Sequence, residues 1–228
     1  MDLQALQDVL AHIRPTVMFY LGPIPVTSTV VNTWIIMAIL LPLAYIISKR
    51  LNLVPHGAQH VPELIADFFN NLLDETVGKK GRKYLPLVGT LFIFILFLNF
   101  AWFIPGMMPP TTDLSTTLAF ALVTIVIVQL IGVKDGGGIK GYIMHFFQPN
   151  PALFPLNMLS ELVKPVSLSL RLYANMFGEK TVVTVLFLMI PFLSPVPVML
   201  LGIIMGLVQA LVFSLLTVIY IASFVGEQ

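Results

Sequence analysis

Long apolar segments, separated by short polar ones, make up most of this chain. Asp, Glu, Lys and Arg are absent from residues 15–48 and 181–226, and Asp113 is the one charged residue within 84–133. A helix needs about 20 apolar residues to cross a bilayer. The pattern therefore predicts an all-α, polytopic membrane protein with about five membrane-embedded helices in a single membrane domain, residues 1–228.

The apolar runs divide into three spans of ordinary length and two longer segments. The spans are expected at 26–48, 86–104 and 114–133. The longer segments, 165–190 and 198–225, would exceed the hydrocarbon thickness of about 30 Å as straight helices. We therefore expect these last two helices to tilt strongly and to form a hairpin.

The less apolar segments are expected at the membrane surface. The N-terminal segment, 1–25, begins with an amphipathic pattern at 2–13 and is then broken by proline and glycine. Residues 51–83 alternate polar and apolar side chains with a helical period, which predicts an interfacial helix. A polar loop is expected over 134–150, followed by an amphipathic stretch over 153–164.

Basic residues gather between alternate spans and predict the orientation of the chain. Loops rich in Lys and Arg stay on the cytoplasmic side of a membrane. This places residue 228 inside and the segment 1–25 and the loops 105–113 and 190–198 outside. The residues that carry the prediction are Lys49, Arg50, Lys79, Lys80, Arg82, Lys83, Lys134, Lys140 and Lys164. Separately from this pattern, we expect the membrane to be a bacterial inner (plasma) membrane.

Composition excludes several kinds of chemistry. A soluble domain carries about 25% charged residues, whereas this chain has 10% charged and 57% hydrophobic residues. The chain has no cysteine, which excludes disulfides and thiolate metal sites. His56 and His60 are four residues apart, but Pro55 and Gly57 oppose a helix there and no third ligand is evident. No metal, cofactor or nucleic-acid partner is expected.

A polar stripe crosses the apolar segment 165–190. Ser167, Arg171, Asn175 and Glu179 recur every four residues and so lie along one helical face. An arginine inside a membrane-length helix costs about 2.5–3.5 kcal/mol on insertion scales. Arg171 either reaches the headgroups or pairs structurally with a carboxylate, or it is a functional group with a fixed positive charge.

The last apolar segment carries groups that complement this stripe. Gly202 and Gly206 have the GxxxG spacing that lets helices approach closely. Gln209 lies in apolar surroundings and needs a hydrogen-bond partner, for which the polar stripe is the natural candidate.

The segment PVSLSLRLYANMFGE resembles the signature of subunit a of the rotary F-type ATP synthase. KKGRKYLPLVGTLFIFILFLNFAWFIPG and TVIYIASF resemble other parts of that family, so the resemblance covers much of the chain. It implies a stator subunit that packs against a ring of subunit c and supplies two aqueous half-channels. The implied partners are the subunit c ring, the subunit b peripheral stalk, the remaining complex and membrane lipid.

The resemblance also assigns residues. Arg171 matches the family's essential arginine, Asn175 the polar residue one turn on, and Gln209 the glutamine of the last helix. Glu179 resembles the inlet carboxylate, but the usual position, nine residues after the arginine, is occupied by Lys180.

Other positions in this pattern are less regular. Gly202 stands where some members carry a His or Glu partner for the inlet acid. Ser167 and Lys180 are also assigned to the proton path, and Asp113 is either an inlet residue or a solvated loop acid.

Two rival functions remain open. A secondary transporter would be expected to show inverted repeats and several midplane charges, and no repeat is evident. A passive membrane anchor would leave the polar stripe without a role.

The chain lacks a GxxxxGK[ST] phosphate-binding loop, so it is not expected to be an enzyme by itself. The coupling ion, proton or sodium, stays open.

Overall fold

The computed structural model is almost entirely helical, and it describes residues 16–49, 60–104, 107–135, 138–147, 154–189 and 195–225. The expected surface helix at 2–13 and His56 lie outside these residues. The long elements are α2 (Ser28–Lys49), α3 (His60–Thr76), α4 (Leu85–Phe100), α5 (Leu114–Asp135), α6 (Gly138–Phe147), α7 (Phe154–Met189) and α8 (Pro195–Val225). Between them lie the short 3-10 helices η2 (Lys79–Tyr84), η3 (Ala101–Phe103) and η4 (Pro110–Thr112), and the first described elements are the strands β1 (Val17–Leu21) and β2 (Ile24–Thr27).

Within the described residues, 4 segments are long and apolar enough to cross a membrane. They are Ser28–Lys49, Lys79–Phe103, Leu114–Asp135 and Val196–Val225. The prediction of an all-α, polytopic membrane protein is confirmed. The fifth expected membrane-embedded helix, α7, is not among the four, and the polar stripe that runs through it lowers its hydropathy.

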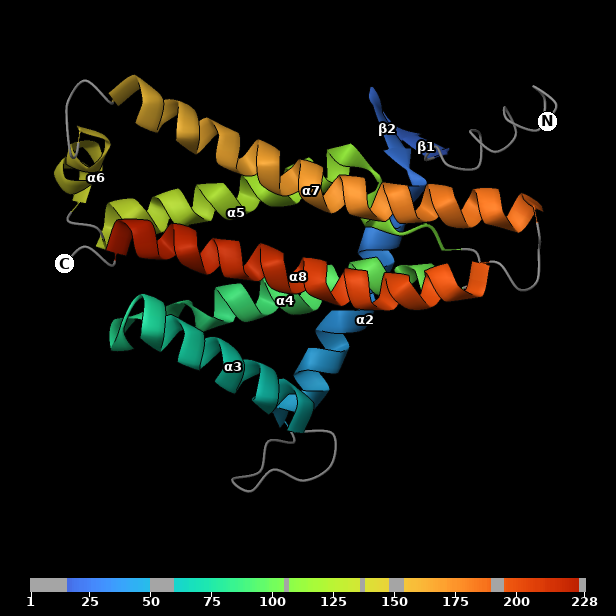
Figure 1. Ribbon diagram of the computed structural model, residues 1–228, viewed down its shortest axis with the longest axis horizontal. Coiled ribbons are helices and arrows are strands. Elements are labelled where there is room, and N and C mark those ends of the chain that lie inside the picture. The colour runs from blue at the N-terminus through green and yellow to red at the C-terminus, as the bar shows by residue number, and fades with distance from the viewer. Residues whose placement is uncertain are drawn as a thin grey trace.

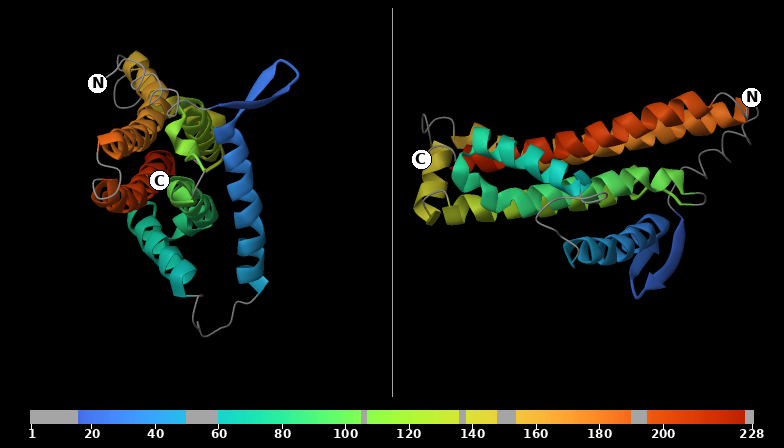
Figure 2. Two further views of the ribbon diagram at one scale, coloured as in Figure 1. Left: turned by 90° about the vertical axis from the view of Figure 1, so that its right-hand side faces the viewer. Right: turned by 90° about the horizontal axis from the view of Figure 1, so that it is seen from below.

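The four helices α4, α5, α7 and α8 run alongside one another along the long axis of the molecule, while α2 crosses their direction (Figures 1 and 2). Their shared core includes Ile95, Val128, Leu172 and Phe213, all almost completely buried. With 36 residues, α7 is about 54 Å long, well beyond the hydrocarbon thickness. This length supports the expectation that the last two helices are strongly tilted.

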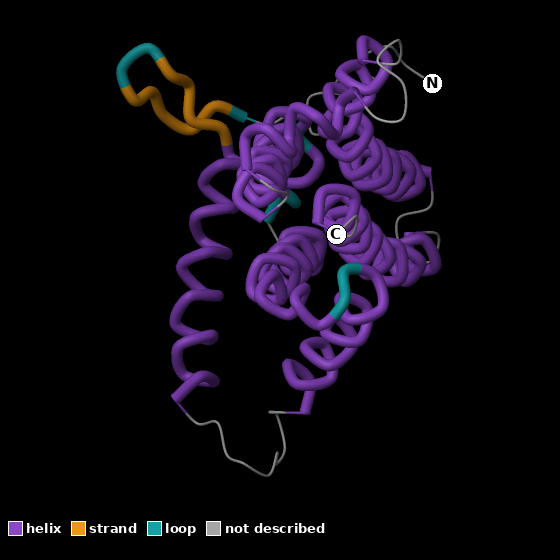
Figure 3. Tube along the Cα trace, turned by 90° about the vertical axis from the view of Figure 1, so that its left-hand side faces the viewer, coloured by secondary structure: helices purple, strands orange, loops and turns teal. Residues whose placement is uncertain are grey.

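The segment expected to be an irregular N-terminal stretch contains a β-hairpin. Strands β1 and β2 pair antiparallel, with Tyr20 opposite Pro25, and Figure 3 shows the hairpin projecting from the helices. Gly22 adopts a φ of 65°, which suits the first position of a two-residue hairpin turn. The proline and glycine signals were therefore turn signals between two short strands, and the first span starts at Ser28 and not at residue 26.

The start of the first long segment was predicted too late. Helix α7 begins at Phe154 and continues through Pro165, so the amphipathic stretch 153–164 and the apolar stretch 165–190 form one helix. Proline removes one backbone hydrogen bond but does not end a helix whose neighbours pack on both sides of it. Pro165 is buried among such neighbours.

Two surface segments also differ from expectation. The interfacial helix predicted over 51–83 is α3, which ends at Thr76; Gly78, with a φ of 83°, separates it from η2. The loop predicted over 134–150 contains α6. This helix places Ile139, Tyr142, Ile143 and Phe146 at helical spacing, a short amphipathic pattern that the three preceding glycines obscured.

Candidate functional site

The polar stripe lies near the middle of α7. Ser167 and Arg171 are exposed, and Asn175 and Glu179, one and two turns further along, are half-buried. Helix α8 runs antiparallel to this face, as the views in Figures 1 and 2 agree. Lys164 Nζ lies 5.0 Å from the centre of the Tyr220 ring, and Asn175 contacts Gln209 in the same register. Arg171 lies between these two points along the helix.

Arg171 has no counter-charge within the part of the chain that the structure describes: no hydrogen bond or ion pair joins its guanidinium to another residue there. It lies near the middle of the 36-residue helix, far from either end. Reaching the headgroups from a helix end therefore becomes a poor explanation for Arg171, and so does pairing with a structural carboxylate. The exposed charge is available to a group outside this chain.

Asn175 and Gln209 form the central contact between the two helices. The Asn175 amide Nδ2 donates a hydrogen bond to Gln209 Oε1 at 2.7 Å, and Gln209 is only 4% exposed. This confirms the prediction that Gln209 finds its partner on the polar stripe. The bond fixes the register of α7 against α8 beside Arg171.

Replacing either partner by leucine is expected to destabilise the chain, because it leaves the other amide buried without a partner. The double replacement Asn175→Leu with Gln209→Leu should cost less than the two single changes together, with a coupling energy of about 0.6–1.7 kcal/mol. Unfolding in detergent, followed for all four proteins, measures this term. Additive effects would show that the contact carries no energy.

Glu179 occupies the space beside Gly202 on α8. A Cβ built at Gly202 would lie 1.7 Å from Glu179 Oε1 and 2.3 Å from its Cδ, so the carboxyl group sits where a larger side chain would be. Among the described residues, Glu179 has no hydrogen-bond or ion-pair partner. Some members of the family that the sequence resembles carry a His or Glu at the position of Gly202. Here glycine leaves that space free, and the Glu179 carboxyl fills it.

The second glycine of the GxxxG pair serves a different neighbour. Gly206 lies against the Asn99 side chain of α4, and Asn99 Nδ2 donates to the Gly206 carbonyl at 2.9 Å. The predicted close helix contact is confirmed at Gly206, against α4, whereas at Gly202 the space is taken by the Glu179 side chain of α7. Helix α8 therefore contacts α7 through Gly202 and α4 through Gly206.

Three polar atoms are buried and lack a partner in the described portion of the chain: Asn99 Oδ1, Trp102 Nε1 and Thr111 Oγ1. A buried polar atom without a protein partner is usually satisfied by ordered water. Of the three, Asn99 Oδ1 belongs to the side chain that also bonds the Gly206 carbonyl of α8. Asn99, only 3% exposed, was not among the predicted site residues, and its one signal in the sequence is an amide within an apolar helix.

Neither Lys180 nor Asp113 provides the atoms nearest to Gly202, which all belong to Glu179. Lys180 is buried on the next face of α7, as expected for a residue one position further along a helix. Asp113 Oδ1 accepts the Ser115 backbone N–H at 3.0 Å at the start of α5, and Asp113 Oδ2 accepts a hydrogen bond from Thr29 at 2.9 Å. Asp113 therefore has a structural role, and its assignment to the inlet stays a prediction.

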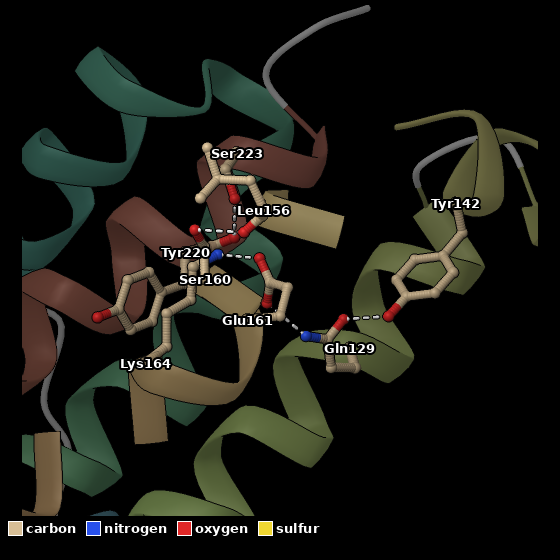
Figure 4. Close-up of polar contacts among 8 residues, drawn as sticks. All are labelled: Gln129, Tyr142, Leu156, Ser160, Glu161, Lys164, Tyr220 and Ser223. Atoms are coloured by element: carbon tan, nitrogen blue, oxygen red, sulfur yellow. Dashed lines mark hydrogen bonds and ion pairs between the residues drawn. The ribbon is translucent and has the colours of Figure 1, made fainter. Parts of the chain in front are cut away.

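A second polar cluster joins α5, α6, α7 and α8 beyond Lys164 (Figure 4). Gln129 Nε2 donates to Glu161 Oε2 at 2.7 Å, and the Tyr142 hydroxyl donates to Gln129 Oε1 at 2.6 Å. Glu161 also pairs with Lys164, three residues on in the same helix. Burial raises the pKa of the Tyr142 phenol, and the nearby Glu161 carboxylate raises it further.

The sequence held a signal for this cluster. Glu161 and Lys164 have the spacing of a helical ion pair, and Gln129 is an isolated amide in an apolar helix. What it could not show is that these groups also meet Tyr142 and Tyr220, so that residues of four helices come together.

Ion pairs also hold the basic segment η2 in place. The Arg82 guanidinium contacts both carboxyl oxygens of Asp74 on α3, and this hydrogen bonding holds the pKa of Asp74 below its usual range. Lys83 Nζ lies 2.9 Å from Asp135 Oδ1 at the end of α5. Lys79 and Lys80 remain exposed.

The described residues contain no group of three His, Cys, Asp or Glu side chains that would hold a metal ion.

Comparisons with known proteins give a consistent result. The sequence profile of the family described as "ATP synthase A chain" matches residues 30–222. The "ATP synthase subunit a" of Moorella thermoacetica is 63% identical over 216 residues, which cover 95% of this chain and 99% of that protein. The "ATP synthase subunit a 1" of Syntrophotalea carbinolica is 41% identical, over 87% of this chain and 86% of that protein. The "ATP synthase subunit a 3" of Pelobacter propionicus is 42% identical, over 86% of both.

Proposed function

Because the chain belongs to the ATP synthase subunit a family, we propose that it is the ion-translocating stator subunit of a rotary F-type ATP synthase. In this proposal two offset half-channels pass protons to and from carboxylates on the subunit c ring, and Arg171 is the electrostatic gate between them. The ATP chemistry belongs to other subunits of the complex.

The observation that carries the proposal is the exposed, unpaired charge of Arg171 in the described chain, halfway along a membrane-length helix. Its counter-charge is then expected from a neighbouring protein. A carboxylate that faces lipid must be neutral, because its charge is costly to bury. Facing Arg171 at about 4 Å and an effective dielectric of about 20, its ionised form gains roughly 4 kcal/mol.

This energy is enough to drive a proton off the rotor. About 4 kcal/mol corresponds to about 3 pKa units, so a carboxyl that is protonated in lipid releases its proton when it reaches Arg171. Because arginine stays protonated, its charge also repels protons that would pass directly between the half-channels. Each proton that crosses 100 mV supplies about 2.3 kcal/mol, which rotation converts into work.

The polar groups on either side of Arg171 support two separate paths. Towards the end of α7, Glu179 lies beside Gly202, near the buried amide of Asn99. We assign these groups to the outer path, with Glu179 handing protons to the ring. Towards the start of α7, Glu161 is the nearest carboxylate of the polar cluster that includes Gln129. We assign this cluster to the inner path.

The orientation follows from the basic residues. The ends of α5 and α8 lie at one end of the long axis together with α6, and the end of α7 and start of α8 lie at the other (Figure 1). We propose that the first of these faces the cytoplasm of a bacterium, which puts the C-terminus inside. The subunit b peripheral stalk and the subunit c ring are the proposed neighbours in the membrane.

The substitution Gly202→Ala tests the outer path. The added methyl group cannot coexist with the present position of the Glu179 carboxyl, since its Cβ would lie 1.7 Å from Oε1. ATP-driven proton pumping in inverted vesicles is expected to fall several-fold, although alanine favours a helix by about 1 kcal/mol over glycine. The matched control is Gly178→Ala, where a Cβ meets nothing within 4 Å.

Gly178→Ala should pump at the wild-type rate. Equal pumping by both variants, at equal amounts of assembled complex, would remove the Glu179–Gly202 contact from the proton path.

A further inference from the structure

The β1–β2 hairpin exposes apolar side chains on both of its faces. Phe19 and Tyr20 are adjacent in β1, so their side chains point to opposite faces of the ribbon. They are 42% and 71% exposed, and the neighbouring Val17 and Met18 are 47% and 61% exposed. The described residues thus cover neither face of β1, although an isolated two-stranded hairpin is marginally stable in water.

The hairpin is also uncharged and joined directly to a membrane span. No Asp, Glu, Lys or Arg occurs between residues 15 and 48, a run that includes the hairpin and nearly all of α2. The Ser28 backbone N–H, at the first residue of α2, donates to the Thr16 carbonyl at 2.8 Å and closes the base of the hairpin. The ribbon therefore starts at the level where the helix leaves the hydrocarbon.

We propose that the β1–β2 hairpin lies within the membrane interface at the start of α2 and anchors this end of the helix to the phospholipid. Docking to another protein would need one apolar face and leave the other polar, whereas here both faces are apolar. A surrounding medium covers both faces at once. Exposed Phe and Tyr side chains are typical of the interface between headgroups and acyl chains.

The backbone fixes the depth of the hairpin. Strand edges have unpaired N–H and C=O groups and do not occur in lipid-exposed positions within the hydrocarbon. The edges must therefore reach headgroups or water, while Met18, Phe19 and Tyr20 lie against the acyl chains. Since the run 15–48 carries no charge, the attachment should not depend on anionic lipid.

The anchored end of α2 is bonded to the loop beside α7. Thr29 donates to Asp113, and Asn32 Nδ2 donates to the Met108 carbonyl at 2.8 Å. The same loop contains η4, which packs against α7 and α5. Lipid anchorage of the hairpin thereby holds this loop against the helix that carries Arg171.

Single spin labels test the proposal in the full-length chain. Because the chain has no cysteine, Met18→Cys or Tyr20→Cys introduces its only thiol. The labelled chain is reconstituted in phosphatidylcholine vesicles, and collisions with oxygen, which enters lipid, are compared with collisions with a water-soluble nickel chelate. Reference labels are Val126→Cys, 55% exposed in the middle of α5, and Glu75→Cys, exposed on the polar side of α3.

The ratio of oxygen to nickel collisions at residues 18 and 20 is expected to be several-fold higher than at residue 75 and lower than at residue 126, as befits an interfacial depth. Adding phosphatidylglycerol should leave it unchanged. A ratio equal to that at residue 75 would overturn the proposal. In the assembled complex, benzoylphenylalanine in place of Tyr20 should cross-link to phospholipid, and a cross-link to protein would equally overturn it.

Discussion

Replacement of Arg171 by alanine is expected to abolish ATP-driven proton pumping while ATP hydrolysis continues. The change removes the charge that releases protons from the rotor, an effect of roughly 4 kcal/mol or about a thousandfold in the equilibrium. Hydrolysis should persist because the chain has no phosphate-binding loop of its own. Fluorescence quenching of a pH-sensitive dye in inverted vesicles measures pumping, and phosphate release measures hydrolysis.

Two variants control for this result. Leu170→Ala removes a neighbouring side chain that is 46% exposed but carries no charge, and it should pump nearly normally. Arg171→Lys keeps the positive charge but loses the planar fork that can bind both carboxyl oxygens, so it should remain strongly impaired. Normal pumping by Arg171→Ala would mean that Arg171 is structural and that the ion path lies elsewhere.

Replacement of Glu179 by glutamine is the second change with a large expected effect. The amide keeps the size of the side chain beside Gly202 but cannot carry a proton. Since a positioned acid–base group contributes about 10²–10⁴-fold to proton transfer, pumping should fall at least about tenfold. ATP synthesis driven by an imposed pH difference should fall in parallel.

The controls separate lost proton transfer from lost folding. Glu179→Asp keeps a carboxyl and should retain more activity than the amide. Glu75→Gln makes the same chemical change at an exposed position of α3 and should leave pumping intact. If the glutamine variant at 179 pumped as well as the aspartate variant, Glu179 would not be the inlet acid.

The polar stripe could be predicted from sequence because an amide or charge is costly in an apolar helix. Because of that cost, Arg171, Asn175 and Gln209 could be identified as candidates from the sequence alone. The hydrogen bond from Asn175 to Gln209 confirms that Gln209 finds its partner on the polar stripe. The role of Gly202 could not be predicted, since an absent side chain gives no signal until the neighbouring carboxyl is located.

Local turns and short helices were harder to predict. Gly22 and Pro23 break a helix and also close a hairpin, and the sequence alone does not distinguish the two. Pro165 marked a false helix boundary, because packing on neighbouring helices outweighs one lost hydrogen bond. Helix α6 could not be predicted because glycines precede its short amphipathic pattern. The hydrogen bond from Tyr142 to Gln129 joins residues of two helices, so it depends on the tertiary fold.

Passive proton flux through the assembled complex tests the gate most directly. Vesicles that contain the complete synthase, with its ATPase sector inhibited so that the ring cannot turn, are given an imposed membrane potential. The account predicts that the wild-type complex stays tight and that the Arg171→Ala complex conducts protons, because the charge that separates the two paths is gone. An Arg171→Ala complex as tight as the wild type would contradict the account.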